Sequence, residues 1–126
     1  DTERLPWRAG VVAERDTGVT LAVEVKDLLW VEDTGQRTWL LRLGADFALP
    51  WEVHDTPEEG FLLEGQFRLG ECLEDGPVHG DYGPGGYFYR TEGVPHGGMQ
   101  SGTDSYAFFL LRTPTNLTVR FQDACP

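Results

Sequence analysis

Residues 49 to 65 read L-P-W-E-V-H-D-T-P-E-E-G-F-L-L-E-G, and this stretch carries most of the information about the fold. In an extended strand, residues two apart lie on the same face, so Glu52 and His54 point the same way and their apolar neighbours point the other way. A turn predicted at residues 55 to 57 reverses the chain and can bring Glu58 back beside His54. Such a pattern is typical of a barrel wall that presents a metal ion inward.

Short segments that alternate apolar and polar residues, or that are rich in branched and aromatic residues, recur between turns rich in Gly, Pro and Asp. Residues 24 to 32 form a short helical turn at most, since no segment carries a convincing helical apolar stripe. Many short strands with regular turns predict an all-β sandwich or barrel, in one domain over residues 1 to 126. The predicted strands are residues 20–26, 37–43, 47–54, 59–69, 86–90, 106–112 and 117–121.

A second candidate histidine lies far downstream, in the segment G-V-P-H-G-G at residues 93 to 98. The sequence predicts a tight, glycine-rich turn here. His96 has little bulk around it and can therefore reach a site shared with other side chains. On the strand leading toward it, either Tyr87 and Tyr89 or Phe88 face the interior, and buried tyrosines would be candidates for contacting a substrate or supporting the metal ligands.

The charge balance is strongly acidic, with a formal net charge of -11 and a sequence pI of about 4.5. No basic stripe is present to bind phosphates, so we expect neither nucleic acid nor an anionic membrane as a partner. A metal cation and a small-molecule substrate are the expected partners. Three arginines on or beside predicted strands can anchor a substrate carboxylate or lie on a solvated strand face: Arg42, Arg90 and Arg112.

No apolar run approaches the ~18 residues that span a bilayer, and the first residues from Asp1 open no signal-peptide pattern. We therefore expect a cytoplasmic protein. Cys72 and Cys125 form neither a CxxC motif nor a zinc-finger spacing. In a reducing compartment we expect two free thiols, with one disulfide between them as the alternative.

The two histidine-bearing segments resemble the two motifs of the cupin superfamily. The first motif has the form G, five residues, H-x-H, three or four residues, E, six residues, G. His54, Glu58 and Gly65 match its second half in register. Glu52 stands in the place of the first histidine and Asp46 in the place of the leading glycine.

The second motif has the form G, five residues, P-x-G, two residues, H, three residues, N. Gly85, Gly93 and His96 fit this spacing, while Thr91 replaces the proline and Gln100 replaces the asparagine. Within the superfamily, the stretch around the first motif is similar to the acetylacetone-cleaving and ChrR-like branch.

The resemblance covers about residues 37 to 121 and implies a single cupin (jelly-roll) β-barrel with short N-terminal strands. It implies one divalent metal ion held by His54, Glu58 and His96, with Glu52 in the place of the fourth ligand. Glu52 is either that ligand or a general base beside the metal, and the sequence does not separate the two roles. Two histidines and a carboxylate suit Fe(II), with Zn(II) and Mn(II) as alternatives.

The resemblance also implies a metal-dependent enzyme that acts on a small chelating organic substrate. We expect a dioxygenase-type oxidoreductase in which Glu52 or Tyr89 moves protons. One alternative is a cyclase, isomerase or decarboxylase that uses the metal as a Lewis acid. Another is a non-catalytic cupin that binds or senses a metal or small molecule, as a closed four-ligand shell would favour.

We expect a homodimer, because a sheet edge needs covering. The N-terminal strand region can add to the sheet of a partner through its apolar residues, which are Leu5, Trp7, Val11 and Val12.

Overall fold

The computed structural model describes residues 1–13, 20–45, 47–100 and 106–125, and their regular structure is almost entirely β-strand. Among these residues, no helix has the length and apolar character needed to cross a membrane. In chain order the elements are the 3₁₀ helix η1 (Thr2–Arg4) and the strands β1 (Arg8–Ala13), β2 (Thr20–Val31), β3 (Gln36–Gly44), β4 (Ala48–His54), β5 (Glu58–Glu64), β6 (Phe67–Leu73), β7 (Gly76–Tyr82), β8 (Tyr87–Arg90), β9 (His96–Gln100), β10 (Tyr106–Thr113) and β11 (Val119–Phe121).

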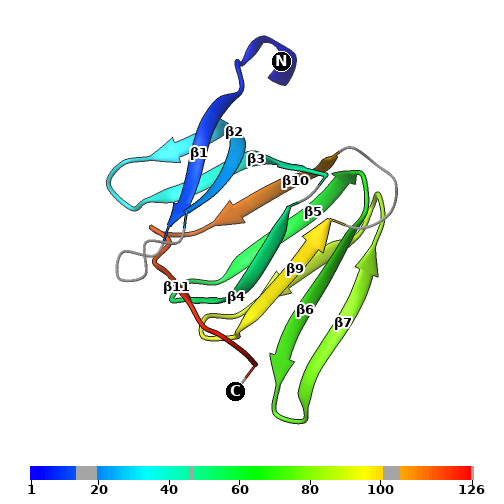
Figure 1. Ribbon diagram of the computed structural model, residues 1–126. Helices are drawn as coiled ribbons and strands as arrows, with labels where there is room; N and C mark the ends of the chain where they lie inside the picture. Colours follow the sequence, from blue (N-terminus) through cyan, green and yellow to red (C-terminus); the bar gives the residue numbers. More distant parts are fainter. Residues whose placement is uncertain (14–19, 46, 101–105, 126) are drawn as a thin grey trace.

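The strands form two antiparallel sheets around one core (Figure 1). The first sheet has the order β1-β2-β3-β10-β5-β8 and the second has the order β11-β4-β9-β6-β7. The rings of Phe67 and Phe109 meet edge to face across the sheets, with centroids 5.3 Å apart. This architecture confirms the predicted all-β jelly roll. The core cluster consists of Val23, Val25, Trp39, Leu43, Leu62, Phe67, Leu69, Ala107, Phe109 and Leu111.

Two predicted segments have a different structure. The run predicted as one strand over residues 59–69 forms β5 and β6, because the chain turns at Gly65, whose φ of 85° favours glycine. The segment 24–32, predicted to be a short helical turn at most, lies almost wholly in β2. Its pairing with β3 contains an irregularity between Asp27 and Leu29, which interrupts the simple alternation of a strand.

Two further strands, β7 and β9, were missing from the prediction. β9 begins at His96, so this histidine starts a strand and does not lie in the predicted turn. Pairing with β4 on one side and β6 on the other holds its glycine-rich sequence extended. β7 contains Pro77 and two glycines, which are depleted in strands, but it pairs along its length with β6 at the edge of the sheet, where proline is tolerated.

The N-terminal segment covers part of the outer face of the first sheet. Trp7 packs edge to face on Phe108, with ring centroids 4.9 Å apart, and the Arg42 guanidinium lies 4.5 Å from the Trp7 ring centroid. β1 then pairs with β2 of its own chain at the edge of the sheet. The homodimer stays a prediction, and Asp46, the position of the leading motif glycine, lies outside the described residues.

Cys72 and Cys125 form a disulfide bond, which corrects the expectation of two free thiols. β11 lies beside β4, and the backbone N–H of Gln122 donates to the carbonyl oxygen of Trp51 at 2.8 Å. The C-terminal residues therefore continue along the second sheet as far as β6. There the Cα atoms of the two cysteines lie 5.5 Å apart, a proximity that their separation of 53 positions conceals.

Candidate metal centre

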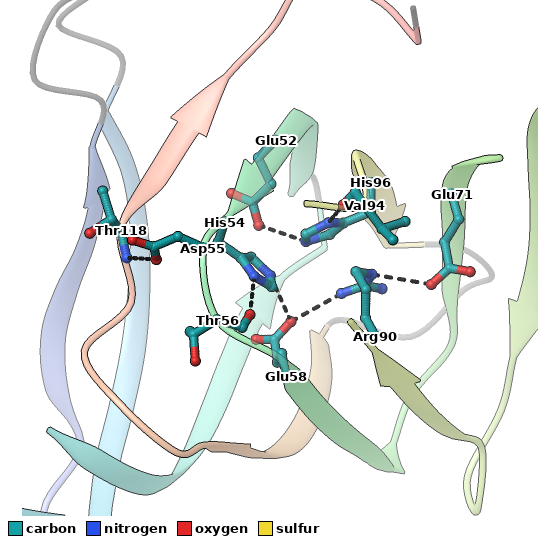
Figure 2. A network of polar contacts seen from close by, with 10 residues as sticks. All are labelled: Glu52, His54, Asp55, Thr56, Glu58, Glu71, Arg90, Val94, His96 and Thr118. Carbon is teal, nitrogen blue, oxygen red and sulfur yellow. Dashed lines mark hydrogen bonds and ion pairs between the residues drawn. The ribbon is translucent and has the colours of Figure 1, made fainter. Parts of the chain in front are cut away.

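Four ionisable side chains that the sequence singled out meet between the two sheets. Glu52 and His54 lie on the same face of β4, Glu58 is the first residue of β5, and His96 is the first residue of β9. The register of β4 with β9 places Glu52 opposite His96. All four residues are buried, and Figure 2 shows the two imidazoles between Glu52 and Glu58.

Each histidine is oriented by a backbone carbonyl two residues away. Nδ1 of His54 lies 2.8 Å from the carbonyl oxygen of Thr56, and Nδ1 of His96 lies 3.0 Å from that of Val94. Because a carbonyl oxygen only accepts, each Nδ1 carries the proton and donates it. In the neutral ring, Nε2 is then an unprotonated acceptor, which is the form that binds a metal.

The two Nε2 atoms face carboxylate oxygens. Nε2 of His96 lies 3.1 Å from Oε1 of Glu52, and Nε2 of His54 lies 3.4 Å from Oε2 of Glu58. Within the described residues, Nε2 of His54 and Oε2 of Glu52 are buried without a hydrogen-bond partner. Acceptors that face one another in a dry interior need protons or a cation between them. The donor set therefore fits a divalent metal ion.

Glu58 is ionised although it is buried. Burial alone would raise the pKa of its carboxyl. The contacts with His54, Arg90 and His96 lower the pKa by more, so it lies below its ordinary value. For His54 the effects have the opposite sign. Burial lowers the pKa of its imidazole, but the carboxylates of Glu58 and Glu52 and the carbonyl of Thr56 raise it by more, so the pKa of His54 lies above its ordinary value. Oε2 of Glu58 accepts from Nη1 of Arg90 at 3.0 Å, and Nε of Arg90 donates to Glu71 at 3.1 Å.

The geometry brings Glu52, His54 and His96 together most closely, with one ligand atom from each lying within 4.8 Å of the others. Glu58 lies beside this group and is already bound by Arg90. The role of Glu58 as a ligand stays a prediction. Glu52 belongs to the closest group of candidate ligand atoms, whereas the sequence indicated only a possible fourth ligand at this position.

Tyr89 does not reach the site. The alternation along β8 turns Phe88 and Arg90 inward and leaves Tyr87 and Tyr89 on the outer face, where Tyr89 is 58% exposed. This placement corrects the expectation that Tyr89 moves protons in catalysis. The side chains that accompany the candidate ligands are instead Arg90, weighed earlier only as one of three arginines, and Glu71. Glu71 was missed because it lies beyond the predicted strand.

A cavity of about 510 Å³ opens beside the candidate ligands. Its polar lining includes Glu52, Glu58, Arg90 and His96. A cavity that is mostly apolar with a few convergent polar groups is the usual form of a small-molecule site. Its apolar walls include Val23, Val25, Leu41, Leu43, Phe47, Phe67, Phe88, Phe109 and Leu111.

The chain matches the ChrR cupin-like domain over residues 1–116. Among curated proteins, none matches it in sequence.

Solved structures share its fold. An RmlC-like cupin protein from Ralstonia eutropha JMP134 is 16% identical, with a TM-score of 0.70 over 93% of this chain and 68% of that one. The Fe(II) form of HppE, in complex with substrate, is 18% identical, with a TM-score of 0.64 over 88% of this chain and 57% of that one. Recombinant oxalate oxidase in complex with glycolate is 16% identical, with a TM-score of 0.65 over 79% of this chain and 54% of that one. The chain spans little more than half the length of the last two, and these likenesses show the cupin fold alone.

Proposed function

The chain belongs to the ChrR cupin-like domain family, and on this premise we propose that it is a metal-dependent enzyme whose ion is held by Glu52, His54 and His96. The proposed ion is Fe(II), and the proposed substrate is a small organic molecule with chelating oxygen atoms. The proposed reaction is an oxidation of the dioxygenase type. The cavity beside the three residues is large enough for such a molecule.

The observation that carries this proposal is the pair of histidines whose Nδ1 atoms are committed to backbone carbonyls. Both Nε2 atoms are thereby offered as metal ligands beside the Glu52 carboxylate. Two histidines and one carboxylate form the donor set of non-haem Fe(II) oxygenases, which leaves coordination positions for substrate and O₂. A solved structure of the same fold, HppE, is described in its Fe(II) form.

The chain's own residues would prepare this chemistry. The bound ion would supply Lewis acidity and a binding position for O₂. The carbonyls of Thr56 and Val94 hold the imidazole rings in one orientation. The ionised carboxylate of Glu58 lies beside Nε2 of His54 and lines the cavity. The apolar walls of the cavity restrict water around the reacting groups.

The contact between Glu58 and His54 favours a second candidate function, a non-catalytic metal-binding or sensing cupin. If Glu58 moved from Arg90 to the ion, four protein ligands would close the coordination shell. In the structure Glu58 is held by Arg90 at 3.0 Å, which favours three ligands and an open site. Lewis-acid chemistry with Zn(II) or Mn(II) is the alternative within the enzyme class.

The test is elemental analysis of protein purified without added metal. We expect about one equivalent of divalent metal in the wild type and a loss of most of it in His54→Ala and in His96→Ala. His79→Ala is the matched control, because His79 is the remaining histidine and is exposed on β7. A wild type without stoichiometric metal would contradict the metal site. Metal without consumption of O₂ on any chelating substrate tried would favour the sensing cupin.

A further inference from the structure

Arg90 is buried at the edge of the candidate metal centre, with its side chain only 1% exposed. Three contacts fix its guanidinium, and those with Glu58 and Glu71 are drawn in Figure 2. Nη1 donates to Oε2 of Glu58 at 3.0 Å, Nε donates to Oε1 of Glu71 at 3.1 Å, and Cζ lies 4.7 Å from the ring centroid of Phe88. A guanidinium held on three sides cannot turn freely toward another partner.

The third nitrogen of the guanidinium, Nη2, takes part in none of these contacts. Nη2 of Arg90 is buried and has no hydrogen-bond partner among the described residues. An arginine stays charged at any physiological pH, and a buried N–H group without an acceptor is costly. Arg90 also lines the 510 Å³ cavity. The unpaired nitrogen is therefore a donor whose missing partner an anion entering from that cavity would supply.

This donor lies next to the candidate metal ligands. Oε2 of Glu58 contacts both Nη1 of Arg90 at 3.0 Å and Nε2 of His54 at 3.4 Å. One oxygen atom thus separates the guanidinium from a metal-binding imidazole. The guanidinium and the candidate metal ligands are therefore close neighbours.

Unlike Arg90, the other arginines near the cavity or on the same sheet have, within the described residues, no buried nitrogen that lacks a hydrogen-bond partner. Arg8 and Arg37 also line the cavity, and both bind Asp27. On the sheet's outer face, Arg112 pairs with Glu59 at 3.3 Å. Arg42 pairs with Glu24 at 2.7 Å.

We propose, on the basis of the proposed function, that Nη2 of Arg90 binds the carboxylate of the substrate. The substrate class is a small monocarboxylic acid with an oxo or hydroxy oxygen at its second carbon and an apolar body. The carboxylate would pair with Arg90, the neighbouring oxygen would face the ion, and the body would lie against the apolar walls.

Charge balance supports a monoanion. A divalent ion would be balanced by the carboxylates of Glu52 and Glu58, and the charge of Arg90 is balanced by its second partner, Glu71. The side chain of Glu71 is 33% exposed and partly solvated. A bound monoanion therefore adds one net negative charge and a dianion adds two, so the monoanion costs less to bury.

The experiment measures binding to Zn(II)-loaded protein by titration calorimetry, which needs no turnover. The probes are 4-methyl-2-oxopentanoate and its uncharged amide, and the metal content of every sample is measured. We expect the wild type to bind the acid at least about tenfold more tightly than the amide, and Arg90→Gln to weaken acid binding by about 10- to 100-fold, since hydrogen bonds to charged groups carry most of this preference. Arg112→Gln, which removes an arginine paired with glutamate on the outer face, should bind both probes as the wild type does.

The proposal is overturned if the metal-loaded wild type binds acid and amide alike, if it binds neither, or if Arg90→Gln keeps the preference for the acid. Circular dichroism shows whether Arg90→Gln is folded. If it is not, Arg90→Lys serves instead, because it keeps the charge but not the forked donors and should lose much of the preference. A wild type that takes up no metal contradicts the proposed function, whereas metal without a preference for the acid contradicts only this inference.

Discussion

Nε2 of His96 lies 3.1 Å from Oε1 of Glu52, although the two residues are 44 positions apart in the chain. The pairing of β4 with β9 creates this contact by placing the two residues opposite each other. Because Nδ1 of His96 donates to the carbonyl of Val94, the contact joins two acceptors when the ring is neutral. A metal ion shared by Glu52 and His96 would resolve it.

Glu52→Gln and Glu58→Gln separate a direct ligand from a neighbour. We expect Glu52→Gln to weaken metal binding by more than the roughly 10- to 100-fold typical of an outer partner, and Glu58→Gln to fall within that range. Competition with a chelator gives both affinities. Equal losses in the two variants would show that Glu58 is a ligand as well, and would favour the closed shell of a sensing cupin.

Gly60→Ala tests the support beneath Arg90. A Cβ atom at this position would overlap the ring of Phe88 and lie 2.8 Å from Cδ2 of Leu111. We expect the free energy of unfolding in urea to fall by about 1–3 kcal/mol, as for other overpacked cores. Gly44→Ala is the control, since nothing lies within 4 Å of its added Cβ. If both variants are as stable as the wild type, the packing between β5 and β8 is looser than described.

Asp27→Asn tests the ion pairs that tie β1 and β3 to β2. Burial would raise the pKa of Asp27, but its hydrogen bonds and ion pairs with Arg8 and Arg37 lower it below the ordinary 3.8. A carboxyl whose pKa is lowered on folding stabilises the protein above its unfolded pKa, and this stability is lost as the pH falls through the folded pKa. We therefore expect Asp27→Asn to cost about 1 kcal/mol at pH 7 and the difference from wild type to shrink below about pH 3.8. A difference that is independent of pH would point to packing and not to charge.

Cys125→Ser tests the tether between the C-terminal residues and β6. Closing a loop of 53 residues restricts the unfolded chain, so we expect the variant to lose about 2–4 kcal/mol of unfolding free energy. Cys72→Ser should lose the same amount, and the double variant no more than either one. Additive losses, or an unchanged melting temperature under a reductant, would show that the two sulfurs are not bonded in solution.

Spacing and alternation predicted much of the fold and the location of the site. The alternation at Glu52 and His54 follows directly from strand geometry, and the cupin spacing related His96 to them across 44 positions. The recognition of a cupin and the all-β fold are confirmed. The fold class and the cupin resemblance both rest on residue spacings within single segments, which can be read directly from the sequence.

What the sequence could not predict depends on contacts between distant segments. β9 is strand because β4 and β6 hold it on both sides, not because its glycines favour an extended chain. The disulfide requires the C-terminal residues to pass along the second sheet. Arg90 faces inward, and Tyr89 outward, because β8 takes one of two registers that the sequence leaves equivalent.

The measurement that tests the central claim most directly is an anomalous difference map from crystals of protein purified without added metal. The account predicts one strong peak, about 2.0–2.2 Å from Nε2 of His54, Nε2 of His96 and a carboxylate oxygen of Glu52. Data on both sides of the iron absorption edge identify the element. The absence of a peak between these three residues, or a peak held by other side chains, would contradict the account.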